Sequence, residues 1–303
     1  LVRILATRCR LSVAKMRSLI TEILATEPIL DPEEEAFVVF SQDIPSQSLG
    51  FIDSQDPTLE ITVAGHDLVI HHSKGLLTSN RSEGTTGAMV WKVTPLFATW
   101  ISSPTNFLFT NQLITPSSTI LELGAGVSGI VALCLGSRVA SYTATDQDYV
   151  LKLLRQNIAE NLGTVIQVKR NSGRGSKKHQ DRSKSGGGGG GGIDRITTLE
   201  LDWETDATFH LNPVDMIVAC DCVYNEALVE PLNATCAAIC RLKEGSGSPT
   251  LCLIAQQLRS PEVFETWLKG FHQSFHVWQV PDSMLGEGLR EGSGFVVHIG
   301  IVR

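Results

Sequence analysis

A glycine-rich segment and an acidic residue downstream of it have the spacing of a nucleotide-binding site. Gly124-Ala125-Gly126-Val127-Ser128-Gly129 follows a short apolar run and opens an apolar helix, which is the context that the Gly-x-Gly-x-x-Gly pattern requires. Glycine permits a tight turn there and lets a nucleotide approach the backbone closely. Asp146 ends the next predicted strand, where a carboxylate can accept hydrogen bonds from both hydroxyls of a ribose. The pattern therefore indicates a site for a dinucleotide or for S-adenosylmethionine (AdoMet).

The residues around the glycine pattern favour AdoMet. Glu122 lies two positions before the first glycine, where its charge would attract the sulfonium and amino groups of AdoMet and repel a pyrophosphate. A short-chain dehydrogenase would need a tyrosine followed four residues later by lysine, and none of the three tyrosines satisfies this spacing. A purely structural turn, with Asp146 capping the next helix, is the alternative at this point.

Strand and helix patterns alternate around these residues. Strands are predicted over the apolar or β-branched runs 120–123, 141–145, 196–203, 215–220, 250–255, 277–280 and 295–302. Apolar residues at helical spacing predict helices over 90–101, 130–135, 150–162, 229–239 and 263–271. This alternation is typical of an α/β domain with a largely parallel sheet. The last two strands have no helix between them and predict an antiparallel edge hairpin, and residues 59–72 predict a second hairpin.

The composition limits the class of protein. Apolar residues make up 42% and charged residues 19% of the 303 residues, so a core can form. No run reaches the roughly eighteen uninterrupted apolar residues of a membrane span, and we expect no membrane association. A formal charge of −7 argues against a general nucleic-acid binder. Seven cysteines, an odd number found mostly in apolar runs, fit buried thiols in a reducing compartment.

Two segments depart from this composition. Residues 1–20 are rich in arginine and precede the first acid, Glu22, which fits either a mitochondrial presequence or an extension upstream of Met16. We favour the extension and expect a cytoplasmic protein. Residues 171–192 are basic and end in the unbroken glycine run 186–192, which predicts a flexible, solvated insertion in the domain. Contact of this insertion with RNA or an acidic protein is the alternative.

Five short motifs stand in a characteristic order along the chain: Thr85 to Trp91, Glu122 to Gly129, Thr145-Asp146, Asp202-Trp203 and Asp221-Cys222-Val223-Tyr224. In these motifs and their order the chain resembles the seven-strand methyltransferase-like family 16 of protein-lysine methyltransferases. Residues 31–40 and 79–91 are most similar to the fungal branch called ribosomal lysine N-methyltransferase 5. The resemblance covers roughly residues 30–303, and the ordered set is far more specific than the glycine pattern alone.

The resemblance implies which residues hold the cofactor. Trp91 and the turn 124–126 would line it, Asp146 would hold the ribose and Trp203 would flank the adenine. The backbone at Cys220 would lie beside the methionine end, although the family usually has alanine or glycine at that position. The insertion before Trp203 is a second departure from the family. Core packing is the alternative for both tryptophans.

The resemblance also places the substrate amine at Asp221 and Tyr224. This segment follows a buried strand and should lie at the carboxyl edge of the sheet, where α/β proteins bind ligands. A lysine has a free pKa of about 10.4 and must lose a proton before it attacks a methyl group. Asp221 could orient the amine by hydrogen bonding, and the ring of Tyr224 could stack near the cationic nitrogen. An Asp221 that caps the following helix and a Tyr224 in the core are the alternatives.

We expect no metal site. Cys220 and Cys222 lie two residues apart, but no Cys-x-x-Cys pair or nearby histidine completes a set of four ligands. Cys236 and Cys240 share a helical face, again without visible partners. Packing of thiols explains these four residues better than metal binding.

The sequence therefore predicts a seven-strand class I, Rossmann-like AdoMet-dependent methyltransferase. We expect an N-terminal extension and hairpin over 1–80 and a methyltransferase domain over 81–303. The predicted function is methylation of a lysine on a ribosomal protein of the large subunit by a monomeric enzyme. Nucleic-acid contact would be indirect or made through 171–192. The alternatives are a methyltransferase of a small molecule and a non-enzymatic ribosome- or RNA-binding module.

Overall fold

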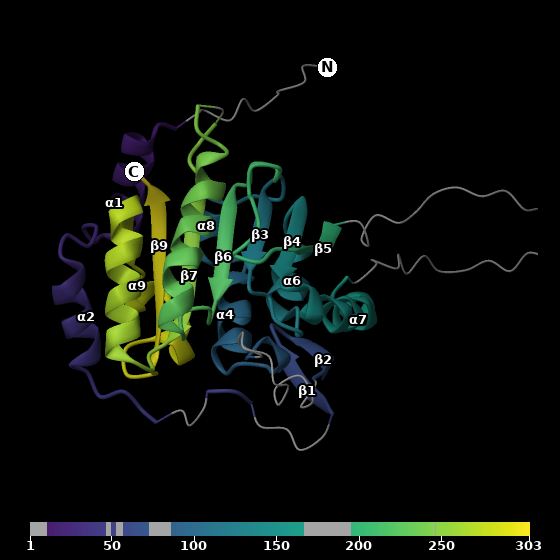
Figure 1. The fold of residues 1–303 in the computed structure, drawn as a ribbon. Coiled ribbons are helices and arrows are strands. Elements are labelled where there is room, and N and C mark those ends of the chain that lie inside the picture. The colour runs from purple at the N-terminus through teal and green to yellow at the C-terminus, as the bar shows by residue number, and fades with distance from the viewer. Residues whose placement is uncertain (1–10, 47–49, 53–56, 73–85, 167–194, 246) are drawn as a thin grey trace, which may run out of the picture.

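A seven-stranded sheet organises the molecule, in the strand order β5-β4-β3-β6-β7-β9-β8 (Figure 1). The computed structural model describes residues 11–46, 50–52, 57–72, 86–166, 195–245 and 247–303. The strands of the sheet are β3 (Thr119–Leu123), β4 (Ser141–Asp146), β5 (Ile196–Glu200), β6 (Met216–Cys220), β7 (Leu251–Gln257), β8 (Phe275–Gln279) and β9 (Phe295–Val302). The first five of these are parallel, and β9 runs antiparallel to both β7 and β8. The α/β class and the antiparallel pair at one edge are thus confirmed.

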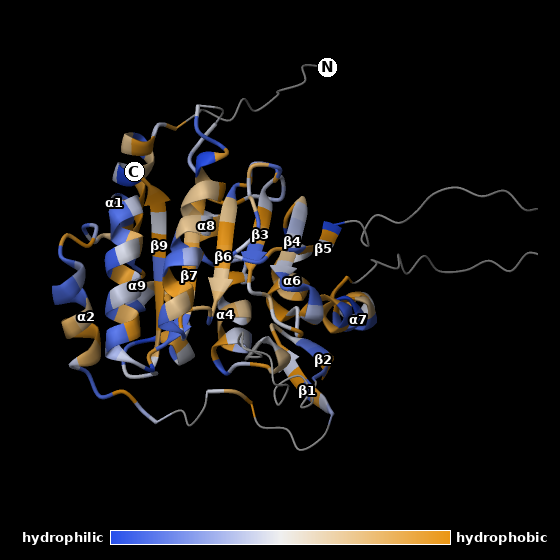
Figure 2. Cartoon of the chain, viewed as in Figure 1, coloured by the Kyte–Doolittle hydropathy of each residue, from blue (hydrophilic) through white to orange (hydrophobic). Residues whose placement is uncertain are grey.

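Helices cover both faces of the sheet, which explains why its central strands are apolar on both sides. Every residue of β6, β7 and β9 is buried, as expected for strands that face helices in both directions. The helices are α1 (Val13–Leu24), α2 (Pro32–Phe40), α4 (Val93–Ile101), α5 (Phe107–Thr110), α6 (Ile130–Gly136), α7 (Asp148–Val165), α8 (Val229–Arg241) and α9 (Pro261–Ser274). Figure 2 shows β6 in hydrophobic colours along its length, whereas the outer side of α9 is hydrophilic.

Two apolar clusters form the core, one on each face of the sheet. Helices α1, α4, α5, α6 and α7 supply the first cluster, and α2, α8 and α9 supply the second. Figure 1 shows α8 and α9 on the opposite side of the sheet from α4 and α6. Because both faces are covered, ligands can reach the sheet only at its edges, where strands end and loops begin.

The predicted hairpin at 59–72 is present as β1 (Thr58–Val63) and β2 (His66–His71). Ala64 and Gly65 connect the strands, both with positive φ, as a tight two-residue turn requires. Helix α7 contacts β2, and Val63 and Leu68 of the hairpin belong to the same apolar cluster as α6 and α7. The division of the chain at residue 80 stays a prediction.

Two expectations concern segments that the structure does not describe in full. The insertion at 171–192 lies outside the described residues, as do residues 1–10 of the arginine-rich start. Within the described part of the chain, no helix is both long and apolar enough to cross a membrane.

Candidate active site

A cavity of about 200 Å³ opens where the parallel strands end. Its walls come from the segments that follow β3, β4, β5 and β6, and from the residues that lead into α4. The residues predicted from the sequence as site residues all line it: Trp91, Gly124, Ala125, Gly126, Asp146, Trp203, Cys220, Asp221 and Tyr224. The fold therefore brings together segments that lie up to 133 residues apart, from Trp91 to Tyr224.

The glycine turn after β3 has the backbone that only glycine adopts readily. Gly124 and Gly126 have φ of 64° and 61°, in the left-handed region that favours glycine. A Cβ atom on Gly124 would lie 2.7 Å from the Sγ atom of Cys222 and 3.1 Å from the ring of Trp203. The first glycine is thus required both by its backbone angles and by its neighbours on two other loops.

Asp146 fixes this turn through its carboxylate. Its Oδ2 atom accepts a hydrogen bond from the N–H of Gly126 and its Oδ1 atom one from the N–H of Gln147, each at 2.8 Å. Burial raises the pKa of Asp146 to about 6, and the two backbone N–H groups oppose that rise. The helix α7 has Gln147 as its N-cap residue, without a side-chain capping bond. Asp146 therefore faces the cavity with its geometry set by the turn, and it is not the cap of α7.

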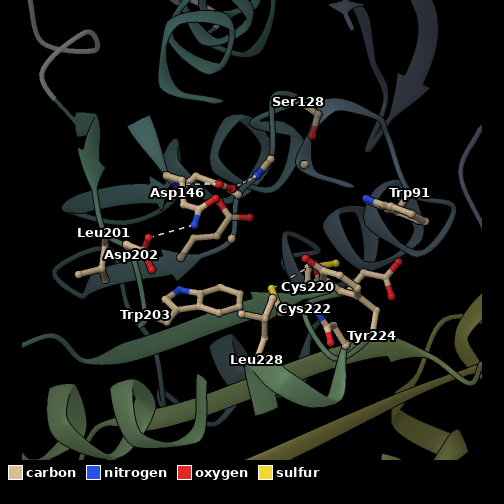
Figure 3. A pocket seen from close by; sticks show the side chains of 18 of the residues that line it. Trp91, Ser128, Asp146, Leu201, Asp202, Trp203, Cys220, Cys222, Tyr224 and Leu228 are labelled. Atoms are coloured by element: carbon tan, nitrogen blue, oxygen red, sulfur yellow. Dashed lines mark hydrogen bonds between the residues drawn. The ribbon is translucent and has the colours of Figure 1, made fainter. Parts of the chain in front are cut away.

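The two tryptophans lie on opposite sides of the cavity (Figure 3). Each is partly buried against one apolar cluster and lines the cavity with the rest of its surface. Trp91 packs edge-on against Phe51, with ring centroids 6.2 Å apart. The loop that carries Trp203 is held by Asp202, whose Oδ2 atom accepts a hydrogen bond from Nε2 of Gln147 at 3.0 Å. Core packing and a role in the cavity thus coexist for both rings.

Glu122 is a buried acid at the base of the cavity. It is 2% exposed, and the hydroxyl of Tyr142 donates to its Oε2 atom at 2.9 Å. Burial raises the pKa of Glu122 to about 8, the hydrogen bond from Tyr142 lowers it, and the charge of Asp146 adds to the rise. A cation bound beside Glu122 would favour its ionised form, as expected for the acid two residues before the first glycine.

The cysteines around the cavity behave as packed thiols. Cys222 donates from Sγ to the carbonyl oxygen of Leu123 at 3.3 Å, and the sulfur of Cys220 lies 3.9 Å from the hydroxyl of Thr94. Burial raises the pKa of both thiols well above its usual value. The described residues contain no group of three or more His, Cys, Asp or Glu side chains that could hold a metal ion.

Asp221 has an ion-pair partner that the sequence motifs did not indicate. Arg259 donates from both terminal nitrogens to its two carboxylate oxygens, at 2.7 Å each. The alternative in which Asp221 caps the next helix is wrong, because Asn225 takes that role and accepts from the N–H of Ala227 at 3.1 Å. Arg259 follows β7 by two residues and Asp221 directly follows β6. Their positions at the carboxyl ends of two strands were the one signal in the sequence that could have indicated this ion pair.

Sequence motifs also missed several residues that line the cavity. Met89 lies within the motif 85–91 but was not singled out there, and other missed residues lie outside the motifs, among them Thr94, Gln147, Tyr149, Leu201 and Leu228. Tyr224, by contrast, was expected here and lies half-buried in the wall beside Cys220 and Cys222 (Figure 3).

Known proteins are similar to this chain across the segments that build the cavity. The model of a family described as lysine methyltransferase matches residues 70–171 and 192–269. A protein of Zygosaccharomyces rouxii named ribosomal lysine N-methyltransferase 5 is 32% identical over 216 residues, which cover 64% of this chain and 67% of that protein. The protein of the same name in Vanderwaltozyma polyspora is 29% identical over 254 residues, covering 73% and 76%.

A third relative carries a different name. A protein of Schizosaccharomyces pombe named diaminohydroxyphosphoribosylamino-pyrimidine deaminase is 26% identical over 251 residues. The match covers 81% of this chain and 52% of that protein, so the chain spans about half the length of this relative.

Proposed function

Because the chain belongs to the lysine methyltransferase family, we propose that it transfers the methyl group of AdoMet to a lysine of a protein, and that this protein belongs to the large ribosomal subunit. The observation that carries the proposal is the meeting, in one cavity, of the glycine turn, the carboxylate of Asp146 and the Asp221–Tyr224 segment. The first two are typical of a nucleoside site, and the third supplies groups that suit an amine.

The residues of the cavity fit AdoMet by their chemistry. When bound, AdoMet supplies a methyl group activated by a positively charged sulfur. The carboxylate of Asp146, held by two backbone N–H groups, has acceptor capacity left for the ribose hydroxyls. Trp203 offers a ring face for the adenine, and Trp91 lines the other side of the site. The acid Glu122 and the backbone at Cys220 suit the cationic methionine end.

Asp221 and Tyr224 would receive the lysine. The carboxylate of Asp221 can accept a hydrogen bond from the amine, and the ring of Tyr224 can lie against its cationic form. These groups place the nitrogen in line with the methyl carbon, and such positioning is the main contribution an enzyme makes to this displacement. The amine must lose its proton before the attack, because only its lone pair can form the new bond.

The names of the Zygosaccharomyces and Vanderwaltozyma relatives support a ribosomal protein as the substrate. The formal charge of −7 and the pI near 5.6 favour an encounter with a basic protein. Asp202 and Glu204 also line the cavity and add to its negative charge. A cytoplasmic site of action follows from this substrate class and is part of the proposal.

The direct test is incubation with methyl-labelled AdoMet and large-subunit ribosomal proteins produced without methylation in bacteria. We expect label on one or a few lysines, located by mass spectrometry of tryptic peptides. A parent protein that binds AdoMet in calorimetry but labels no lysine, and instead labels components of a small-molecule extract, would replace the protein substrate with a small molecule.

A further inference from the structure

Arg259 connects two walls of the cavity that no sequence motif connects. Its guanidinium group binds the carboxylate of Asp221 with two hydrogen bonds of 2.7 Å, and its central carbon lies 4.9 Å from the ring centroid of Trp91. The Asp221 side chain is 1% exposed and that of Arg259 is 24% exposed. A bidentate pair of this kind fixes both direction and distance, which a lysine in place of the arginine could not do.

A segment from the N-terminal part of the chain supports the arginine. Phe51 forms a β-bridge with Trp91, and the carbonyl oxygen of Gly50 accepts from the N–H of Lys92 at 2.8 Å. A Cβ atom on Gly50 would lie 2.8 Å from a terminal nitrogen of Arg259 and 2.1 Å from Oε1 of Gln257. The backbone at Gly50 thus packs so closely against the Arg259 side chain that no larger residue fits at position 50 without movement.

The carboxylate of Asp221 is held from several directions at once. The backbone of Asp221 has a positive φ of 62°, and the N–H of Asp221 donates to the carbonyl oxygen of Ala255 at 2.7 Å. Within the described residues, Oδ1 accepts from Arg259 and from the N–H of Gln257, whereas Oδ2 accepts from Arg259 alone. A carboxylate oxygen can accept two hydrogen bonds, so Oδ2 retains the capacity to accept one from an incoming amine.

We propose that Arg259 is a positioning residue of the lysine site, which holds Asp221 ready to accept a hydrogen bond from the amine and offsets its negative charge. This inference rests on the proposed function, because it assigns a residue to the same lysine site. An unpaired carboxylate beside the substrate would stabilise the ammonium form of lysine, which cannot attack. A carboxylate that is already paired with a guanidinium group orients the amine with much less of this penalty.

The reaction explains why the charge matters. The lysine ammonium group first loses a proton to solvent, and the lone pair of Nζ then forms a bond to the methyl carbon. The bond from that carbon to sulfur breaks, and its electrons stay on the sulfur, which becomes neutral. The methylated nitrogen carries the positive charge afterwards. The pH at which the rate levels off therefore reports the pKa of the bound lysine.

Other titratable groups also face the cavity. Among the described residues, the carboxyl groups besides Asp221 are those of Glu122 on β3, Asp146 on β4, and Asp202 and Glu204 after β5. The thiols in the described part of the wall are Cys220 and Cys222, and the phenols are Tyr149 at the start of α7 and Tyr224 after β6. All of them are retained in variants at Arg259 and Asp221, so a difference in pH profile between variants reports the Arg259–Asp221 pair.

The experiment measures kcat for large-subunit ribosomal proteins, made unmethylated in bacteria, across pH 6 to 10 at saturating AdoMet. In R259Q we expect kcat at pH 7.5 to fall about 10²-fold, the size of loss typical for one positioned contact, and the rise of kcat to shift upward by about one pH unit. In D221N the rise should shift to lower pH, because the arginine then lacks its counter-charge. The kcat of R259K and the pH of its rise should lie between those of R259Q and the parent. Lysine keeps the positive charge but cannot donate the two parallel hydrogen bonds of a guanidinium group.

The double variant D221N/R259Q separates positioning from folding. If Arg259 positions the amine through Asp221, adding R259Q to D221N should change the plateau value of kcat at high pH less than threefold, and thermal melts should show that all variants fold. R241K, at the exposed pair of Arg241 with Glu244 on the surface, serves as the matched control with parental kinetics. Equal pH profiles for parent and R259Q, or full additivity in the double variant, would overturn the inference. A parent protein that labels no lysine would instead contradict the proposed function.

Discussion

The side chain of Asn157 pairs with the backbone of His71 as a neighbouring strand would. Its Oδ1 atom accepts from the N–H of His71 and its Nδ2 atom donates to the carbonyl oxygen of the same residue, each at 2.8 Å. Nδ2 also donates to the carbonyl oxygen of Val127 at 2.7 Å, in the glycine turn. Asn161, one helical turn later, pairs in the same way with Val69. Helix α7 thus joins the edge of the hairpin to the glycine turn that lines the cavity.

Asn157→Ala should destabilise the protein by about 2–4 kcal/mol. The asparagine is fully buried, and its loss removes three hydrogen bonds. The N–H of His71 and the carbonyl oxygens of His71 and Val127 then lose the hydrogen bonds that this side chain supplies. Urea unfolding followed by circular dichroism measures the change. The control is Gln156→Ala on the exposed side of the same helix, which should stay within about 0.5 kcal/mol of the parent. Equal midpoints for the two variants would contradict the bridging role of Asn157.

Gly124→Ala should destabilise the protein by about 1–3 kcal/mol and weaken AdoMet binding. The added Cβ has a strained backbone angle and meets the Sγ atom of Cys222 at 2.7 Å. Part of this loss of stability comes from the collision with the Cys222 sulfur. The loss of stability caused by G124A should therefore be smaller in a C222A background than in the parent protein. Gly163, in α7 with open space around it, is the matched control, and G163A should stabilise by about 0.5–1 kcal/mol. A destabilised G163A or a parental G124A would contradict the geometry of the turn.

Asp146→Ala should weaken AdoMet binding by about 1.5–3 kcal/mol, the cost of a lost hydrogen bond to a charged group. Isothermal titration calorimetry measures the affinity directly. Asp148→Ala, two residues later in the exposed first turn of α7, should bind as the parent does. Because Asp146 also accepts hydrogen bonds from Gly126 and Gln147, a thermal melt must accompany the titration. A folded D146A variant with parental affinity would remove this residue from the cofactor site.

Glu122 should make the stability of the protein fall as pH rises. Its folded-state pKa of about 8 lies above the ordinary value of 4.5, so the folded protein holds this proton more tightly than the unfolded chain. The stabilisation is complete below about pH 4.5 and is lost as pH rises through about 8. Over this window the free energy of unfolding of the parent should fall relative to that of E122Q by up to about 1.4 kcal/mol per pH unit.

Chemical denaturation at pH 5, 6, 7 and 8 tests this dependence. Glu60→Gln, at an exposed position of β1, should keep the pH dependence of the parent, since its carboxyl group is in contact with water in both states. A constant difference in stability between parent and E122Q across the four pH values would show that Glu122 is ionised in the folded protein throughout.

The sequence by itself determined the elements and the edge at which the site forms. Apolar runs and helical spacing are local signals, and they placed the seven strands of the sheet and the helices α4, α6, α7, α8 and α9 to within a few residues. They did not predict α1, α2 or α5. Once β3, β4 and β6 are parallel, the residues that follow them must meet at one edge. For this reason the order of motifs along the chain is enough to predict that Gly124, Asp146 and Asp221 lie together.

Tertiary structure decided the partners of these residues. Arg259 lies 38 residues after Asp221, and Asn157 lies 86 residues after His71, and no local pattern relates either pair. The first contact depends on the lateral order of β6 and β7, and the second on how α7 packs along the edge of the hairpin. The high pKa of Glu122 likewise comes from its burial in the folded state. These properties arise from packing between distant segments, and spacing along the chain contains no information about the distance between such segments.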